Sequence, residues 1–175
     1  MPKLNIEDSV VLIIDVQEKL LNVVFNKEVC AKKAAIMAEA ASILGIPTIV
    51  TEQYPKGLGE TVPEIKNSVS KYFEKTNFSA FEEIEDALEG KKQVVLFGIE
   101  THICVNQTAA ELVSNGYEVY VVKDACGSRA EVEYLAGLER MKDNDAHILT
   151  AEIALFEWLG GAKHPKFKEI QALIK

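Results

Sequence analysis

Short, nearly unbroken apolar runs that alternate with longer helical patterns constrain the fold of this 175-residue chain more than any other feature. A strand that is apolar at almost every position is buried on both faces, which is typical of a parallel sheet covered by helices on both sides. The sequence therefore predicts an α/β protein, a three-layer α/β/α domain with a mostly parallel central sheet. The six expected strands are Val10–Ile14, Pro47–Thr51, Lys71–Lys75, Gln93–Phe97, Glu118–Val122 and His147–Leu149.

Helical patterns fill most of the segments between these strands. The expected helices are Glu28–Leu44, Phe81–Leu88, Val105–Ser114, Glu131–Lys142 and Ile153–Leu159, with a terminal amphipathic helix within His164–Lys175. The segment Glu52–Thr61 carries Pro55, Gly57 and Gly59 and is predicted to be a loop. No repeat or linker interrupts the pattern, and 48% of the residues are hydrophobic, so residues 1–175 are expected to form a single domain.

The charge and the cysteine usage exclude several classes of partner. A formal net charge of -8 argues against binding to nucleic acid or to anionic membranes. No apolar stretch approaches the roughly 20 residues of a membrane span, and Met1–Asn5 lacks the apolar core of a signal peptide. The cysteines Cys30, Cys104 and Cys126 have neither metal-ligand spacing nor an even-numbered disulfide pattern. We therefore expect a cytoplasmic protein that binds neither nucleic acid nor membranes.

Ligands of open parallel α/β sheets bind beyond the carboxyl ends of the strands. The strand predictions alone put six candidate side chains at that edge, where they can share a cleft: Asp15, Glu52, Lys75, Cys104, Asp124 and Cys126.

Cys104 is the strongest candidate nucleophile in this set. It lies just past a buried strand, in the first turn of the helix expected next, where unpaired N–H groups and the helix dipole favour negative charge. A thiol with a pKa of roughly 8.5 in solution can become a thiolate near neutral pH at such a site. The same N–H groups can hold an oxyanion that forms on a substrate. The alternative is a small buried hydrophobic residue, which is how most free cysteines behave.

A nucleophilic thiol needs a proton acceptor or an electropositive setting. Asp15 ends an apolar run, where burial can raise the pKa of its carboxyl, although an aspartate that caps the next helix is an equal alternative. Lys75 can lower the pKa of the thiol and offset the negative charge of a carboxylate. Without these neighbours, the better interpretation of Lys75 would be a solvated lysine at a strand end. His102 lies two positions before Cys104, hence on nearly the opposite face of a helix, and is expected to be a surface or supporting residue.

Three separated motifs resemble the isochorismatase-like cysteine hydrolases, and they occur in the order expected for that family: Leu12–Gln17, Lys75–Phe81 and Gly98–Val105. The segment Asp124–Arg129 extends the resemblance over nearly the whole chain. The loop Thr51–Pro55 and the ending His164–Ile170 resemble the isochorismatase domain-containing branch of the family in particular.

This resemblance implies the isochorismatase-like hydrolase fold and a catalytic triad. Asp15 would take the thiol proton and later activate water, Lys75 would orient and balance the charges, and Cys104 would attack an sp² carbon. The resemblance also implies a cis peptide bond at Ile99–Glu100, which aims the N–H groups of Glu100 and Cys104 at an oxyanion. The implied function is hydrolysis of an amide, carbamoyl or related C–N bond in a small molecule. Isochorismate is a poor candidate substrate, because the true isochorismatases generally lack the cysteine.

The resemblance also bears on metal, substrate contacts and assembly. Nicotinamidases of this superfamily bind a metal through an Asp-x-His sequence and a further histidine, but Thr51–Tyr54 has no histidine here. We therefore expect no catalytic metal and no other cofactor. By location, Gln17, Tyr54 and Arg129 are predicted to contact the substrate, although a salt bridge that supports the next helix is an equal alternative for Arg129. A homo-oligomer is expected.

Two other functions remain open at this stage. The chain can be a small-molecule-binding or scaffolding protein that keeps the fold without useful turnover. It can also be a redox sensor in which Cys126 resolves an oxidised Cys104, although the two cysteines are expected at different strand ends.

Overall fold

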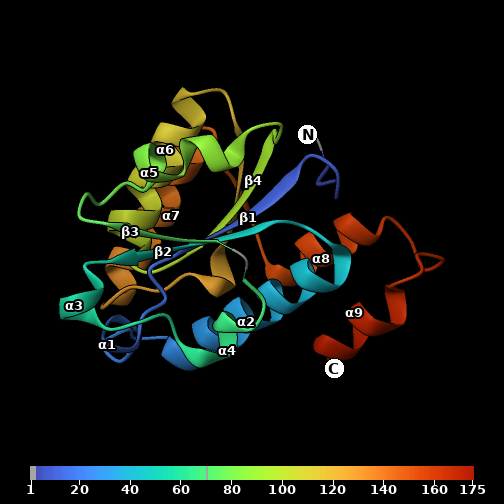
Figure 1. Ribbon diagram of the computed structural model, residues 1–175, viewed down its shortest axis with the longest axis horizontal. Helices are drawn as coiled ribbons and strands as arrows, with labels where there is room; N and C mark the ends of the chain where they lie inside the picture. Colours follow the sequence, from blue (N-terminus) through green and yellow to red (C-terminus); the bar gives the residue numbers. More distant parts are fainter. Residues whose placement is uncertain (1–2, 70) are drawn as a thin grey trace.

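In the computed structural model, which describes residues 3–69 and 71–175, six strands form one sheet in the order β3-β2-β1-β4-β5-β6 (Figure 1). All five pairings are parallel, which confirms the predicted α/β class. The expectation about the N-terminus concerned Met1–Asn5, of which Met1 and Pro2 lie outside the described residues. The strands are β1 (Ser9–Ile14), β2 (Thr48–Gln53), β3 (Lys71–Lys75), β4 (Gln93–Gly98), β5 (Glu118–Val122) and β6 (His147–Leu149).

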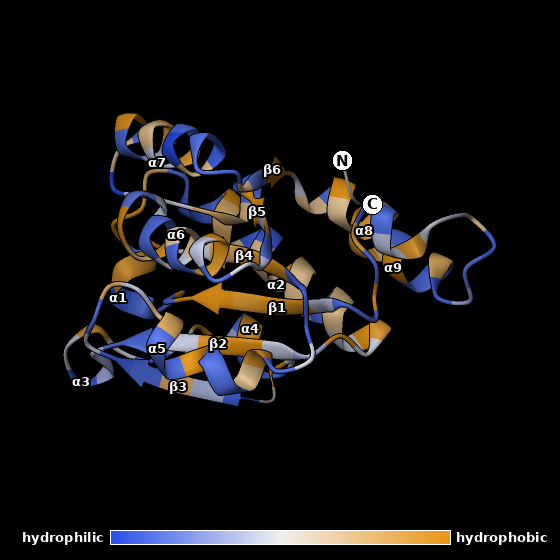
Figure 2. Cartoon of the chain, turned by 90° about the horizontal axis from the view of Figure 1, so that it is seen from above, coloured by the Kyte–Doolittle hydropathy of each residue, from blue (hydrophilic) through white to orange (hydrophobic). Residues whose placement is uncertain are grey.

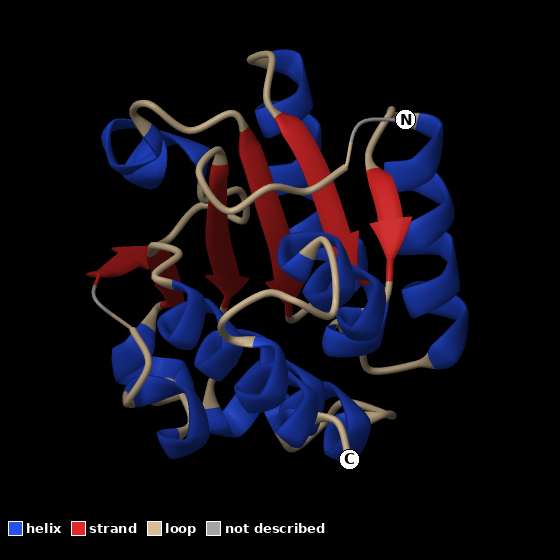
Figure 3. Cartoon of the chain, turned by 90° about the vertical axis from the view of Figure 1, so that its right-hand side faces the viewer, coloured by secondary structure: helices blue, strands red, loops and turns tan. Residues whose placement is uncertain are grey.

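Helices cover both faces of the sheet, as the apolar strands require (Figures 1 and 3). On one face lie α5 (Phe81–Ile84), α6 (Asn106–Ser114) and α7 (Glu131–Asp143), and on the other α2 (Lys27–Leu44), α4 (Pro63–Lys66), α8 (Ala151–Leu159) and α9 (Phe167–Leu173). The remaining short elements are α1 (Glu18–Leu21), α3 (Pro55–Leu58), the 3₁₀ turns Glu85–Leu88 and Lys123–Ala125, and the π-helical turn Thr101–Val105. Within the described residues, no helix is long and apolar enough to cross a membrane.

The burial of each strand matches its apolar content. Every residue of β1 and β4 is buried, whereas β3 is an edge strand whose first four residues are partly or fully exposed. Figure 2 shows the same contrast, with an apolar β1 in the middle of the sheet and a more hydrophilic β3 at its edge.

Two local predictions need correction. The segment Glu52–Thr61 is not a loop throughout, because β2 continues to Gln53, which pairs with Lys75 of β3. It then enters the one-turn helix α3, where proline suits the first helical position because no hydrogen-bond partner is needed there. The helix expected from Val105 also starts earlier, as the π-helical turn Thr101–Val105 that runs directly into α6.

The strand order reverses between β1 and β4, and this switch point sets where the functional residues meet. At the end of β4, Gly98 has a φ of 138°, and a Cβ there would overlap the backbone carbonyl of Ile14. Glycine is therefore required for the ends of β1 and β4 to approach this closely. The approach places Asp15, which follows β1, beside the turn that follows β4.

Candidate active site

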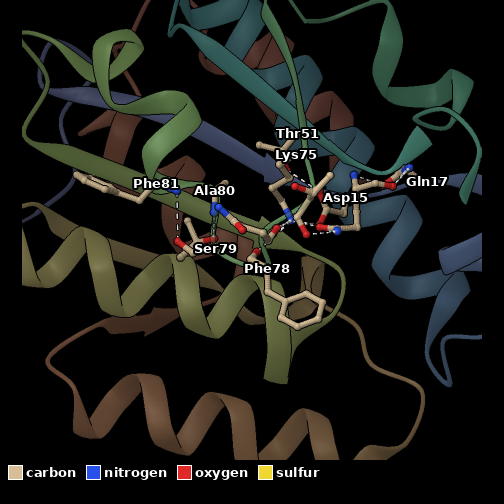
Figure 4. A network of polar contacts seen from close by, with 12 residues as sticks. Asp15, Gln17, Thr51, Lys75, Phe78, Ser79, Ala80 and Phe81 are labelled. Atoms are coloured by element: carbon tan, nitrogen blue, oxygen red, sulfur yellow. Dashed lines mark hydrogen bonds and ion pairs between the residues drawn. The ribbon is translucent and has the colours of Figure 1, made fainter. Parts of the chain in front are cut away.

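Asp15 lies at the centre of a buried polar cluster at the carboxyl edge of the sheet (Figure 4). Its backbone has a φ of 50°, in the left-handed region that non-glycine residues seldom adopt, and its side chain is 0% exposed. The hydroxyl of Thr51 donates to Oδ1 at 2.7 Å, and the Lys75 ammonium forms an ion pair with Oδ2 at 2.8 Å. Burial raises the pKa of the Asp15 carboxyl, and Lys75, Thr51 and Cys104 partly oppose that rise. This makes Asp15 a better proton acceptor than an exposed carboxylate.

Lys75 is the last residue of β3, and its side chain reaches across the end of β2 to β1. Besides the Asp15 carboxylate, Nζ donates to Gln53 Oε1 at 2.6 Å and to the carbonyls of Asn77 and Phe78 at 3.2 and 3.0 Å. The side chain is 0% exposed. One carboxylate oxygen and three hydrogen-bond acceptors therefore surround the ammonium and fix its position.

Cys104 lies in the π-helical turn and completes the cluster. Its side chain interacts with both Asp15 and Lys75, and only 7% of the residue is exposed. Burial raises the pKa of the thiol to about 12, the negative charge of Asp15 adds to the rise, and Lys75 opposes it. The thiolate expected from the helix terminus is therefore not the resting form, because desolvation outweighs the favourable charges.

The turn that carries Cys104 is held on two sides. The backbone N–H and the hydroxyl of Thr101 both donate to the carbonyl of Gly127, each at 2.9 Å. On the other side α7 packs closely through Gly137, where a Cβ would lie 2.9 Å from Cα of His102. The peptide bond Ile99–Glu100 is cis.

Two backbone N–H groups at this turn, those of Glu100 and Cys104, are the expected donors to an oxyanion. Among the described residues, the N–H of Glu100 donates to no recorded protein acceptor, and the N–H of Cys104 donates to none outside its own helical turn. The Glu100 carboxylate forms an ion pair with Arg129, with Nε and Oε1 2.7 Å apart. Arg129 thus supports Glu100, the residue directly before the turn that carries Cys104, rather than the helix that follows Arg129. The Arg129 side chain is itself 62% exposed.

The other two predicted substrate contacts differ in their surroundings. Gln17 is 0% exposed, and its amide donates to the carbonyls of Gln53 and Gly59 at 3.0 and 2.6 Å and accepts from the Gln53 N–H at 2.7 Å. These backbone contacts occupy the amide, so Gln17 fixes the β2–α3 segment in place. Tyr54 is 56% exposed and lines a hollow of about 360 Å³ together with Lys75.

The remaining histidine and cysteine candidates lie apart from the cluster. His102 contacts Ser128 through Nδ1 at 3.1 Å and Glu133 through Nε2 at 4.0 Å, in agreement with a supporting role. Cys126 is fully buried, and its charge interactions involve Cys30 rather than Cys104. Within residues 3–69 and 71–175, no three His, Cys, Asp or Glu side chains are grouped as metal ligands.

Sequence reasoning missed two residues of the site, Thr51 and Gln53. Both lie on β2, between the strands that carry Lys75 and Asp15, and each donates to or accepts from one of these charged groups. The only available signal was their spacing of two in a strand, which puts both side chains on one face of the sheet.

The sequence of this chain is similar to those of known proteins. A family model described as the isochorismatase domain matches residues 9–153. Isochorismatase domain-containing protein 2 of Xenopus laevis is 45% identical over 177 residues, which cover 98% of this chain and 86% of that protein.

Solved structures give the same fold. One described as the MAR1 ribonuclease from Caenorhabditis elegans has a TM-score of 0.95 and 40% identity, over 99% of this chain and 92% of that chain. YcaC from Pseudomonas aeruginosa, solved with covalent acrylamide, has a TM-score of 0.90 and 26% identity, over 98% of this chain and 91% of that chain. YcaC from Escherichia coli, described as an octameric hydrolase of unknown specificity, has a TM-score of 0.87 and 25% identity, over 98% of this chain and 94% of that chain.

Proposed function

We propose that this chain, which belongs to the isochorismatase family, is a cysteine hydrolase of small molecules that uses Asp15, Lys75 and Cys104. The observation that carries the proposal is the buried ion pair of Asp15 and Lys75, with Oδ2 and Nζ 2.8 Å apart, whose two charges both act on the buried thiol of Cys104. The bond cleaved is an amide, carbamoyl or related C–N bond. No metal takes part in the proposed mechanism.

The first half of the reaction acylates the cysteine. Because the thiol is neutral at rest, Asp15 takes its proton as Cys104 Sγ attacks the sp² carbon of the substrate. The oxyanion that develops is held by the N–H groups of Glu100 and Cys104. When the C–N bond breaks, the proton on Asp15 passes to the departing nitrogen, so that a neutral amine leaves and a thioester remains.

The second half regenerates the enzyme. Asp15, again a carboxylate, takes a proton from a water molecule that attacks the thioester carbon. The C–S bond breaks, the acid product leaves, and the proton returns to Cys104. Lys75 keeps its positive charge throughout and stabilises whichever of Asp15 and Cys104 is negative.

Two relatives support the chemistry. The covalent acrylamide on YcaC from Pseudomonas aeruginosa is what an accessible nucleophile in the same fold would produce. The Escherichia coli protein is described as a hydrolase, with its specificity unknown.

The Caenorhabditis elegans relative, described as a ribonuclease, suggests RNA as a second class of substrate. Two observations on this chain oppose RNA. The net charge is -8, whereas RNA binding needs a basic surface. Cys104 is 7% exposed, so a polymer backbone cannot reach it without rearrangement. A small molecule is the better supported substrate.

The test combines labelling with turnover. Acrylamide or iodoacetamide should modify the native protein at Cys104, located by peptide mass spectrometry. A panel of small amides and carbamoyl compounds, followed by ammonia release, should contain substrates that Cys104→Ala no longer hydrolyses while its circular dichroism is unchanged. Hydrolysis retained by Cys104→Ala would refute the proposal. Compounds that bind tightly to the site without any turnover would favour the non-catalytic binding protein instead.

We also propose a cytoplasmic homo-oligomer. All three cysteines are free, which suits a reducing compartment, and a relative of the same fold is described as octameric. Light scattering of the purified protein tests the assembly.

A further inference from the structure

We propose that Thr51 and Gln53 of β2 are positioning residues that hold the two charged members of the site, Thr51 acting on Asp15 and Gln53 on Lys75. This inference rests on the proposed function, but it concerns residues to which the family resemblance assigns no role.

The strand order makes β2 the spacer between the two charges. Asp15 follows β1 and Lys75 ends β3, and β2 lies between these strands in the sheet. In the parallel register Thr51 pairs with Ile14, directly before Asp15, while Gln53 pairs with Lys75 itself. Residues two apart in a strand face the same side, so the hydroxyl and the amide are both presented to the ion pair.

Thr51 fixes the carboxylate. Its hydroxyl, 0% exposed, donates to Asp15 Oδ1 at 2.7 Å, which leaves Oδ2 for Lys75 (Figure 4). The two oxygens of the carboxylate are thereby assigned to different partners, and the plane of the group is set. The titratable groups that face Asp15 are Lys75 from β3 and Cys104 from the π-helical turn. The Glu52 carboxylate, next to Thr51, is bound instead by the N–H and hydroxyl of Thr61.

Gln53 fixes the ammonium. Its Oε1 accepts from Lys75 Nζ at 2.6 Å, and its Nε2 donates to the carbonyl of Thr76 at 2.9 Å, which sets the orientation of the amide. The backbone of Gln53 is in turn held by both ends of the Gln17 amide. The buried Gln17 therefore holds the backbone of Gln53, and the side chain of Gln53 holds the Lys75 ammonium.

Three variants and a matched control test the proposal. Thr51→Val keeps the shape of the side chain and removes the donor, whereas Thr51→Ser restores a hydroxyl. Gln53→Met keeps the length and removes both hydrogen bonds. The control is Thr48→Val, the same chemical change on the same strand, three positions back and hence on the opposite face. Each variant is first checked for an unchanged fold by circular dichroism.

The first readout is the titration of the Asp15 carboxyl carbon by ¹³C NMR, assigned with Asp15→Asn. Loss of a hydrogen bond to the charged form should move the midpoint up by about one pH unit in Thr51→Val. It should stay within a few tenths of a unit in Thr51→Ser and Thr48→Val. A Thr51→Val midpoint equal to that of the wild type would overturn the role of Thr51 whether or not the protein is an enzyme.

The second readout is the rate of Cys104 labelling by iodoacetamide against pH. The acid limb of the wild-type profile should move upward with the Asp15 midpoint in Thr51→Val. In Gln53→Met the plateau rate should fall about tenfold, because Lys75 loses the partner that fixes its position. A Gln53→Met plateau within twofold of the wild type would overturn the role of Gln53. If iodoacetamide does not label wild-type Cys104, the proposed function fails, while the NMR midpoints still decide the role of Thr51.

Discussion

Replacement of Lys75 by methionine should destabilise the protein strongly, and more so as the pH rises. Methionine has nearly the same length as lysine but no charge, so the Asp15 carboxylate loses its ion-pair partner. Both side chains of the pair are 0% exposed, so the carboxylate is left buried. Thr51 remains as a donor to Asp15, whereas Gln53 Oε1 loses its only recorded hydrogen-bond donor among the described residues. Breaking a buried pair by removal of one partner costs about 3–5 kcal/mol. For a chain of this size that corresponds to a fall in Tm of about 10 °C.

The pH dependence follows from the direction of the Asp15 shift. Burial raises the pKa of Asp15 in the folded protein, so this carboxyl favours folding below its unfolded pKa, and that contribution is lost as the pH rises through the folded pKa. Lys75 is the main group that opposes the rise. In Lys75→Met the folded pKa should rise further. The stability lost relative to the wild type should therefore grow as the pH rises through the wild-type folded pKa of Asp15, which lies above the unfolded value of about 4.

Urea unfolding at pH 5 and pH 8, followed by circular dichroism, measures this loss. The double variant Asp15→Asn, Lys75→Met removes both charges and should recover at least about 2 kcal/mol relative to Lys75→Met alone at pH 8. Two results would refute the reasoning. One is a loss that is equal at both pH values, and the other is a double variant no more stable than the single one.

Three further predictions concern the turn that carries the nucleophile. Gly98→Ala should lower the free energy of unfolding by more than about 4 kcal/mol or prevent folding, because a Cβ overlaps the Ile14 carbonyl. Gly160→Ala, also at a positive φ but with open space around it, should cost about 1 kcal/mol in the same urea unfolding experiment. Gly137→Ala should cost about 1–3 kcal/mol and slow the labelling of Cys104, because α7 must move away from the π-helical turn; unchanged labelling would contradict the link. In Asp15→Asn the ultraviolet absorbance of the thiolate should appear at a lower pH than the wild-type pKa of about 12, while turnover is lost, because a charge that raises the pKa of Cys104 is gone.

The strands were predictable because their composition reports their burial directly. An apolar run such as Val10–Ile14 is buried at every position of β1, and the sequence periodicity needs no further information to identify it. The one-turn helices α1, α3 and α4 were missed for the complementary reason. Each has four residues, hardly more than one helical period, so no repeating pattern exists to detect.

The residues of the candidate site also fall into two groups, those that could be predicted from the sequence and those that could not. Strand ends can be located from sequence. The family resemblance and these strand ends together identified Asp15 and Cys104, which follow strands, and Lys75, which ends one. The contacts of Thr51 and Gln53 depend on strand order, because they exist only where β2 lies between β1 and β3. Periodicity identifies a strand but not its neighbours, and a polar residue near a strand end predicts no particular partner.

The state of the thiol shows why burial must be weighed against local charge. The position of Cys104 near a helix start predicts a lowered pKa, and that effect is confined to about one helical turn and to partial charges. Removal of the same side chain from water, with Asp15 beside it, acts in the opposite direction and is the larger effect, so the pKa rises to about 12. In the proposed mechanism Cys104 therefore does not depend on a thiolate that is already present. In that mechanism the reactivity comes from transfer of a proton to Asp15 at the moment of attack. Lys75, which is ion-paired with Asp15 at 2.8 Å, keeps a positive charge beside the negative one before and after that transfer.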